Sequence, residues 1–212
     1  MVHSTPLLNT SPDSTSQVLW LVRHGESTWN ARGLAQGHDD RARLTSRGLR
    51  QARAIAVQLR DRPIRALYAS DLRRALQTAA PLASALGLTV VRDARLRERC
   101  LGILEGTAAA SISPAVSGIS DGRVVNPDAC PDGGESLRDF YRRVAGFAAD
   151  LAAADRARHA GPARDAGPAR DVVIVAHGGT LRMLTACRRG VPVEEMTWDP
   201  LANATVLRSP SH

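Results

Sequence analysis

The sequence contains no lysine, only three cysteines, and few aromatic side chains, which make up 3% of its 212 residues. The three cysteines (Cys100, Cys130 and Cys187) are widely spaced, which excludes a C-x-x-C metal motif and does not suit a disulfide framework. We therefore expect them to be reduced. No apolar run approaches the roughly 20 residues that a membrane-spanning helix needs. Scarce aromatic residues also leave no visible stacking platform for nucleic acid.

Positive charge is abundant, and all of it comes from arginine. The formal net charge is +7, with 28 basic against 21 acidic residues. A basic surface can bind nucleic acid, but these arginines are scattered along the chain. Small phosphorylated anions explain the same charge, because a guanidinium group can donate two hydrogen bonds to one phosphate. We expect a small phosphorylated metabolite as the partner, and neither nucleic acid nor a membrane.

Residues 1–16 are polar, and they lack the basic-then-apolar order of a secretory signal. They predict a disordered leader and, by default, a cytoplasmic protein. Residues 17–212 fit a single domain. Two stretches inside it have no clear periodicity: 107–134, and a flexible linker at 155–171 that holds the tandem repeat AGPARD. Long irregular segments of this kind are usually functional or mobile.

Two apolar runs end in a histidine. Val18–Val22 leads into Arg23-His24-Gly25, and VVIVA at 172–176 leads into His177-Gly178. Such runs are typical of strands buried on both faces of a parallel sheet. Because ligands bind at the carboxyl ends of these strands, His24 and His177 can meet if the two strands are neighbours. The pattern predicts an α/β fold with a mostly parallel sheet.

The remaining pattern predicts three more strands, at 65–69, 89–92 and 204–208. Helices are expected after the N-caps Thr45, Ser70 or Asp71, and Ser136, and over 181–189. Pro81 should kink or split the second of these helices.

Arg73 and Arg74 fall in the first turn of that helix, where the helix dipole disfavours cations. This breach of a local rule hints at function.

Four motifs, in order, resemble the signature of the histidine phosphatase superfamily (phosphoglycerate mutase-like), phosphatase branch. They are RHGESTWN at 23–30, SDLRRALQTA at 70–79, LRERCLGILEG at 96–106 and HGGT at 177–180. The resemblance covers roughly residues 17–208. It implies a three-layer α/β/α sandwich, a variable lid at 107–134, phosphoryl transfer through a phosphohistidine, and a possible homodimer.

The resemblance also implies a role for each matching residue. His24 would be the nucleophile and Glu98 the general acid and base, while Arg23, Arg74 and His177 would hold the phosphoryl oxygens. Asn30, Gly37 and Gly178 would complete the phosphate pocket, with no metal and no cofactor. Arg73 is interpreted as solvated. Two alternatives stay open: Glu98 could pair with Arg97 or Arg99 at the surface, and spacing would allow a His24–Glu26–His177 metal site.

Within the family the choice lies between a phosphatase and a mutase. Mutases resemble one another in a longer insert, whose lysines and arginines grip the carboxylate of phosphoglycerate. Here 107–134 carries only Arg123. We therefore predict a metal-independent phosphomonoesterase acting on a small phosphorylated metabolite, with an uncharged or sugar-like leaving group. The alternative is a cofactor-dependent phosphoglycerate mutase-type phosphomutase. A non-catalytic module that binds phosphate or nucleic acid is a remote one.

Overall fold

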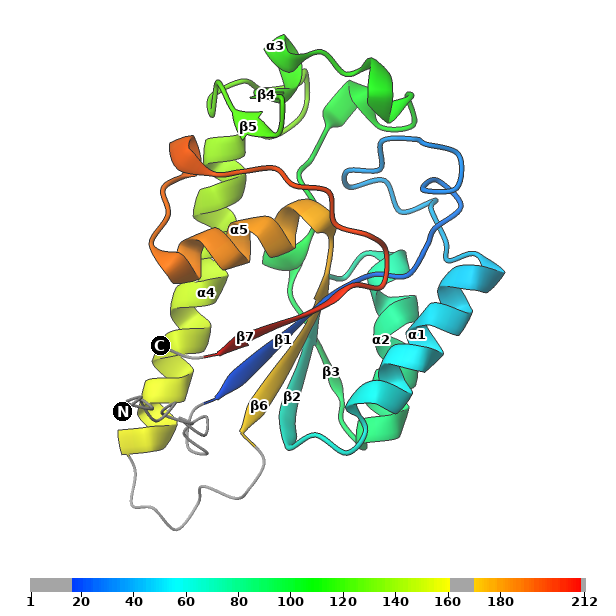
Figure 1. The fold of residues 1–212 in the computed structure, drawn as a ribbon, viewed down its shortest axis with the longest axis vertical. Coiled ribbons are helices and arrows are strands. Elements are labelled where there is room, and N and C mark those ends of the chain that lie inside the picture. Colours follow the sequence, from blue (N-terminus) through cyan, green and yellow to red (C-terminus); the bar gives the residue numbers. More distant parts are fainter. Residues whose placement is uncertain (1–16, 161–169, 211–212) are drawn as a thin grey trace, which may run out of the picture.

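The computed structural model describes residues 17–160 and 170–210. Its centre is a five-stranded sheet in the order β3-β2-β6-β1-β7 (Figure 1). The strands are β1 (Val18–Arg23), β2 (Ile64–Ala69), β3 (Val90–Arg92), β6 (Asp171–Ala176) and β7 (Val206–Pro210). All pairings are parallel except that of β7 with β1, which is antiparallel at the edge of the sheet. The mostly parallel α/β sheet predicted from the sequence is confirmed.

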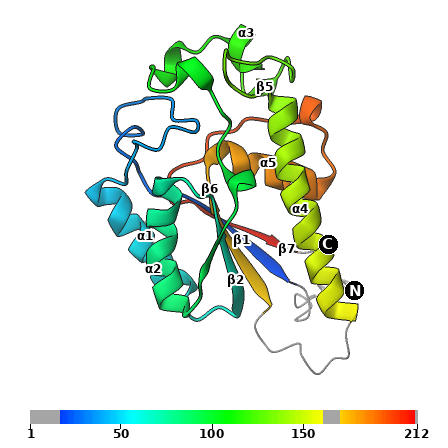
Figure 2. The same cartoon turned by 180° about the vertical axis from the view of Figure 1, so that it is seen from behind.

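Helices cover both faces of the sheet (Figures 1 and 2). The helices α1 (Ser46–Leu59) and α2 (Arg73–Leu86) lie on one face, and α4 (Leu137–Ala160) and α5 (Gly178–Arg189) lie on the other. The alternation along β1 divides the core accordingly. Leu19 and Leu21 pack in the cluster that contains Phe140 of α4, while Trp20 packs in the cluster that contains Leu59 of α1.

Helix starts follow the predicted caps in two of three cases. Thr45 caps α1 by accepting a hydrogen bond from Gly48 N, and Ser136 Oγ accepts one from Asp139 N in α4. The expected cap at Ser70 or Asp71 is wrong, because Leu72 is the N-cap of α2 and makes no side-chain cap bond. Pro81 lies inside α2, which continues through it without a split.

The expected linker at 155–171 needs correction at both ends. Residues 155–160 belong to α4, and Asp171 is the first residue of β6. The buried Asp171 carboxylate accepts hydrogen bonds from Val18 N (3.1 Å) and Trp20 Nε1 (2.9 Å), which tie β6 to β1. Residues 161–169 of the repeat and the expected leader at 1–16 lie outside the described residues.

The strand register brings the two histidines to one edge. Arg23 pairs with Ala176 in the β1–β6 ladder, and His24 N donates to Ala176 O at 2.9 Å. The same edge is covered by the segment 107–134, at the top of Figure 1. This segment contains a 3₁₀ turn (Ala109–Ser111), the short helix α3 (Pro114–Ser117), and the hairpin of β4 (Ile119–Ser120) and β5 (Arg123–Val124).

The remaining short elements are 3₁₀ turns at Ala94–Leu96, Gly102–Leu104 and Val193–Glu195. All three cysteines are free thiols. Among the described residues, no helix combines the length and the apolar character that crossing a membrane requires.

Candidate active site

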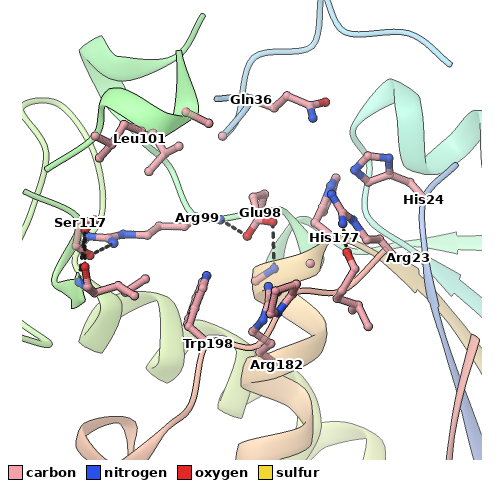
Figure 3. Close-up of a pocket in the computed structure, with 18 of the residues that line it drawn as sticks. Arg23, His24, Gln36, Glu98, Arg99, Leu101, Ser117, His177, Arg182 and Trp198 are labelled. Atoms are coloured by element: carbon pink, nitrogen blue, oxygen red, sulfur yellow. Dashed lines mark hydrogen bonds between the residues drawn. The ribbon is translucent and has the colours of Figure 1, made fainter. Parts of the chain in front are cut away.

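A pocket of about 540 Å³ opens at the carboxyl ends of the strands, beneath the segment 107–134 (Figure 3). Seven of the eight predicted site residues line it: Arg23, His24, Gly37, Arg74, Glu98, His177 and Gly178. Asn30 is not in the lining. Its Oδ1 accepts hydrogen bonds from Ser27 N (3.1 Å) and Asn203 Nδ2 (3.0 Å), and this braces the loop beside the pocket.

The ring of His24 is buried and held in one tautomer. Its Nδ1 lies 2.8 Å from Gly25 O, and because a carbonyl only accepts, Nδ1 must carry the proton. The lone pair is therefore on Nε2, which makes no hydrogen bond within the part of the chain that the structure describes. Burial, followed by the charges of Arg74 and Arg23, holds the pKa of His24 well below its usual value. His24 is thus a neutral ring with a free lone pair.

His177 lies beside His24, with 5.1 Å between the ring centroids. Arg74 Nε donates to His177 Nδ1 at 3.2 Å, so the proton of the neutral ring is on Nε2 and points to Ser70 Oγ at 2.9 Å. Burial and the charge of Arg74 hold the pKa of His177 well below its usual value. The sequence indicated only a cap for Ser70, and its contact with His177 depends on β2 lying next to β6.

Because these two rings are buried, we expect the free energy of unfolding to decrease as the pH is lowered below about 6.5. In the unfolded chain both imidazoles bind a proton near that pH, whereas in the folded chain their pKa values are well below it. Each ring therefore adds a slope of up to about 1.4 kcal/mol per pH unit. Urea unfolding at pH 7, 6 and 5 measures this slope. His24→Gln should remove one ring's share, and an unchanged slope in that variant would contradict the assignment.

Arg74 and Arg23 supply positive charge next to the histidines. The buried Arg74 donates to Gly37 O (2.8 Å) and Asp39 O (3.0 Å), while Arg73 is exposed, as predicted. Burial lowers the pKa of Arg74 to about 10, so it stays charged at neutral pH. Arg23 donates from Nη1 to Leu201 O. Its buried Nε has no hydrogen-bond partner among the described residues, which leaves one N–H available for an anion.

Glu98 reaches the amino end of α5. Its Oε2 accepts from Gly179 N at 3.0 Å, and its Oε1 accepts from the adjacent Arg99 N at 2.9 Å. A Cβ at position 179 would lie 2.2 Å from Glu98 Oε1, so this approach requires glycine. The alternative surface pairing is wrong: Arg97 binds Asp71 (Nε–Oδ1 2.7 Å), and the Arg99 guanidinium binds backbone carbonyls.

Two side chains that the sequence did not reveal hold the backbone of Glu98. Its carbonyl oxygen accepts from His38 Nε2 (2.8 Å) and from Arg143 Nη2 (3.1 Å). Arg143 is in turn paired with Glu135, at 2.7 Å between Nη2 and Oε2. The backbone of Glu98 is therefore held from both the 36–40 loop and α4.

Gly37 and Gln36 complete the wall opposite Glu98. Gly37 has a φ of +48°, and a Cβ there would lie 2.1 Å from Glu105 Oε1, so two independent constraints require glycine. Gln36 lines the pocket and accepts from Ser27 Oγ at 2.8 Å through Oε1, which leaves its amide N–H groups as donors. Gln36 was missed because a glutamine in a polar loop carries no distinctive pattern.

The segment 107–134 is anchored by one buried arginine. The Arg99 guanidinium donates to the carbonyl oxygens of Ser117 (2.6 Å), Ala129 (2.7 Å) and Glu135 (2.7 Å). Burial lowers the pKa of Arg99. One side chain thereby fixes two points of the segment 107–134 and the residue that follows it.

Substitution of Arg99 by methionine should loosen this cover. Three carbonyl oxygens lose their partner, and we expect a loss of about 2 to 4 kcal/mol in stability, with faster amide hydrogen exchange confined to 107–134. Hydrogen–deuterium exchange measures this directly, with the exposed Arg142→Met on α4 as the matched control. If the amides of 107–134 exchange at the same rate in Arg99→Met as in wild-type protein, Arg99 does not anchor the segment.

The open possibility of a metal site finds no support in the side chains. Glu26 turns away from His24 and His177, because its carboxylate accepts from Thr45 Oγ1 (2.8 Å) and Arg47 Nη1 (3.3 Å). Across the described ranges, no group of three or more His, Cys, Asp and Glu side chains is placed to hold a metal ion.

Comparisons with known proteins match nearly the whole described chain. The sequence profile of the histidine phosphatase superfamily (branch 1) matches residues 19–209. The chain is 34% identical over 198 residues to the probable phosphoglycerate mutase GpmB of Yersinia pestis, covering 90% of this chain and 83% of that protein.

Two solved structures are similar over most of the chain. A mycobacterial glucosyl-3-phosphoglycerate phosphatase has a TM-score of 0.74 and 34% identity, covering 91% of this chain and 92% of its own. The alpha-ribazole phosphatase of Shigella flexneri has a TM-score of 0.67 and 31% identity, with coverages of 84% and 82%.

Proposed function

Because the chain belongs to branch 1 of the histidine phosphatase superfamily, we propose that it hydrolyses a small phosphorylated metabolite without a metal, through a phosphohistidine on His24. The observation that carries the proposal is the buried His24 ring, whose Nδ1 proton is fixed on Gly25 O so that the lone pair of Nε2 is free. The adjacent Nε–H of Arg23, buried without a partner among the described residues, supports an anion at the same place.

In the first step Nε2 of His24 attacks phosphorus in line with the leaving oxygen. The N–P bond forms as the P–O bond breaks, and the electron pair leaves with the oxygen, which takes a proton from Glu98. Arg23 and Arg74 stabilise the charge on the equatorial oxygens, because fixed cations in a buried site cost no reorganisation. General acid help of this kind is typically worth about 10² to 10⁴ in rate.

In the second step water attacks the phosphorus of the phosphohistidine. Glu98, now ionised, accepts the proton of this water, and the P–N bond breaks to give inorganic phosphate and the neutral His24 ring. Glu98 suits both steps because its backbone is fixed by His38 and Arg143, while its carboxylate rests on the Gly179 N–H. Only the hydrogen bonds that the carboxylate accepts from Gly179 N and Arg99 N must be exchanged for the substrate.

His177 changes its protonation in this proposal. Without a ligand its single N–H is used on Ser70 Oγ, and Nδ1 accepts from Arg74. A phosphoryl dianion next to the ring favours the protonated form. Protonation of Nδ1 breaks the hydrogen bond from Arg74 Nε, which then turns to the phosphoryl group. His177 would donate from Nδ1–H to a phosphoryl oxygen while Ser70 keeps Nε2–H in place.

The segment 107–134, which covers the pocket, favours hydrolysis over transfer of the phosphoryl group to a second hydroxyl group. The four residues that 107–134 contributes to the lining are Ala109, Ile112, Ser117 and Ile119, none of them charged. A mutase must retain a bisphosphate intermediate, and this cover offers it no cation.

The proposal is tested with p-nitrophenyl phosphate and a panel of sugar phosphates, phosphoglycerates and nucleotides, with EDTA present. Wild-type protein should release inorganic phosphate, and His24→Ala should not. Equal activity in the variant would overturn the nucleophile. Transfer from 2,3-bisphosphoglycerate to monophosphoglycerate without net phosphate release would overturn hydrolysis in favour of a mutase. The homodimer suggested by the family resemblance stays a prediction, which analytical ultracentrifugation tests.

A further inference from the structure

The loop that contains His38 contacts both halves of the proposed chemistry. The buried guanidinium of Arg74, next to the nucleophile, donates to Gly37 O at 2.8 Å and to Asp39 O at 3.0 Å. His38 lies between these two residues in the chain, and its Nε2 lies 2.8 Å from the backbone oxygen of Glu98. One short loop therefore joins the phosphate-binding arginine to the residue that transfers the proton.

His38 is half-buried, and both its backbone and its ring are held. Its backbone N–H donates to Glu105 Oε1 at 2.7 Å, and the same oxygen accepts from Leu101 N at 3.0 Å. Because the Glu98 carbonyl oxygen only accepts, the His38 ring must carry its proton on Nε2. Burial lowers the pKa of His38, so the ring is neutral near pH 7. His38 is thus a neutral donor in a fixed place.

A single peptide unit connects His38 to the carboxylate of Glu98. The oxygen that His38 contacts belongs to the peptide between Glu98 and Arg99, and the N–H of this peptide donates to Glu98 Oε1 at 2.9 Å. The peptide is planar and trans, so the direction of its C=O sets the direction of its N–H. A donor on the C=O also polarises the peptide, which strengthens its N–H as a donor. The hydrogen bond from His38 therefore acts on the resting position of the carboxylate.

Arg143 donates to the same oxygen, but its role is broader. Its Nη2 lies 3.1 Å from Glu98 O and 2.7 Å from Glu135 Oε2, while its Nη1 holds the carbonyl oxygens of Arg95 and Arg97. Arg143 therefore supports the whole segment before the catalytic carboxylate. The ring of His38, by contrast, makes its one hydrogen bond within the described residues to Glu98 O. A change in the His38 side chain therefore addresses the peptide of Glu98 selectively.

We propose that His38 is a positioning residue for proton transfer, which holds the peptide after Glu98 so that the carboxylate rests where the substrate meets it. The inference rests on the proposed function and deepens it. His38 is not in the lining of the pocket, so it acts through Glu98 and not on the substrate. Substitution of His38 should therefore slow the steps in which Glu98 transfers a proton, and it should leave phosphate binding unchanged.

The test compares phenyl phosphate with p-nitrophenyl phosphate, which have the same shape at the phosphoryl group but differ in the basicity of the leaving oxygen. Phenolate needs a proton from Glu98, whereas p-nitrophenolate leaves without one. His38→Ala should lower kcat/KM for phenyl phosphate by about 5- to 20-fold, the range expected for loss of one supporting hydrogen bond. For p-nitrophenyl phosphate kcat/KM should stay within about twofold, as should the affinity for inorganic phosphate.

Two further variants separate positioning from a general loss of structure. His38→Gln, whose amide can donate to the same oxygen, should restore most of the activity on phenyl phosphate. In a Glu98→Gln background His38→Ala should cause no further loss, because residues that act through one group are not additive. The matched control is Arg43→Gln, an exposed residue of the same connection between β1 and α1, which should behave as wild type.

Wild-type activity of His38→Ala on phenyl phosphate would overturn the inference, and so would an equal loss on both substrates. A full further loss in the Glu98→Gln background, or no recovery in His38→Gln, would show that the hydrogen bond to Glu98 O is not the cause. The proposed function fails separately: in that case wild-type protein does not hydrolyse p-nitrophenyl phosphate, or Glu98→Gln alone hydrolyses phenyl phosphate at the wild-type rate.

Discussion

Replacing His24 with alanine is expected to lower kcat/KM for p-nitrophenyl phosphate by at least about 10⁴-fold, because the covalent route is lost with the nucleophile. The remaining pocket supplies no substitute. His177 is the nearest imidazole, but Arg74 covers its lone pair at Nδ1 and its Nε2 carries the proton. Steady-state release of p-nitrophenolate, followed by absorbance, measures the loss.

The control for this variant is binding of inorganic phosphate, since Arg23 and Arg74 are still present. Isothermal titration should show that His24→Ala binds phosphate within a few-fold of the wild-type affinity, with unchanged circular dichroism. Activity within tenfold of wild type in a folded, phosphate-binding variant would mean that another group attacks phosphorus.

Replacing Glu98 with glutamine should have effects that depend on the leaving group. For alkyl phosphates, whose alkoxide needs a proton, kcat/KM should fall by about 10² to 10⁴-fold. For p-nitrophenyl phosphate the first step should be little affected, because p-nitrophenolate leaves without protonation. Hydrolysis of the phosphohistidine still needs the base. Stopped-flow mixing should therefore show a burst of about one p-nitrophenolate per active site, followed by slow turnover.

Glutamine preserves the shape of Glu98 and can still accept from the Gly179 N–H. The matched control is the exposed Glu195→Gln, which should behave as wild type on both substrates. An equal loss of activity on alkyl and p-nitrophenyl phosphates in Glu98→Gln, with no burst, would show that the residue positions the substrate but transfers no proton.

The sequence predicted the parts of this site that are carried by strand ends. Two buried runs before His24 and His177 mark the central strands, and the parallel register of β1 and β6 makes the two rings neighbours. Arg74, and not Arg73, was predicted to bind the phosphoryl group because it matches a motif. In α2, Arg74 is buried and Arg73 is exposed.

The residues that the sequence missed act through contacts with no periodic signature. Arg99 and Arg143 donate to backbone carbonyls, which every residue offers, so no partner type marks them. Ser70 resembled a helix cap, and its true partner is set by the order of the strands. The Arg182 guanidinium lies over the ring of Trp198. This contact joins α5 to the segment that follows it, and no sequence pattern marks it.

The most direct test of the central claim is chemical trapping of the phosphorylated protein. Glu98→Gln is mixed with ³²P-labelled p-nitrophenyl phosphate, quenched in alkali within the burst, and digested. We expect about one label per chain, stable to alkali and released by acid, on the peptide that contains His24, and none in a His24→Ala, Glu98→Gln double variant. Absence of a trapped label despite turnover, or a label on any other residue, would contradict phosphoryl transfer through His24.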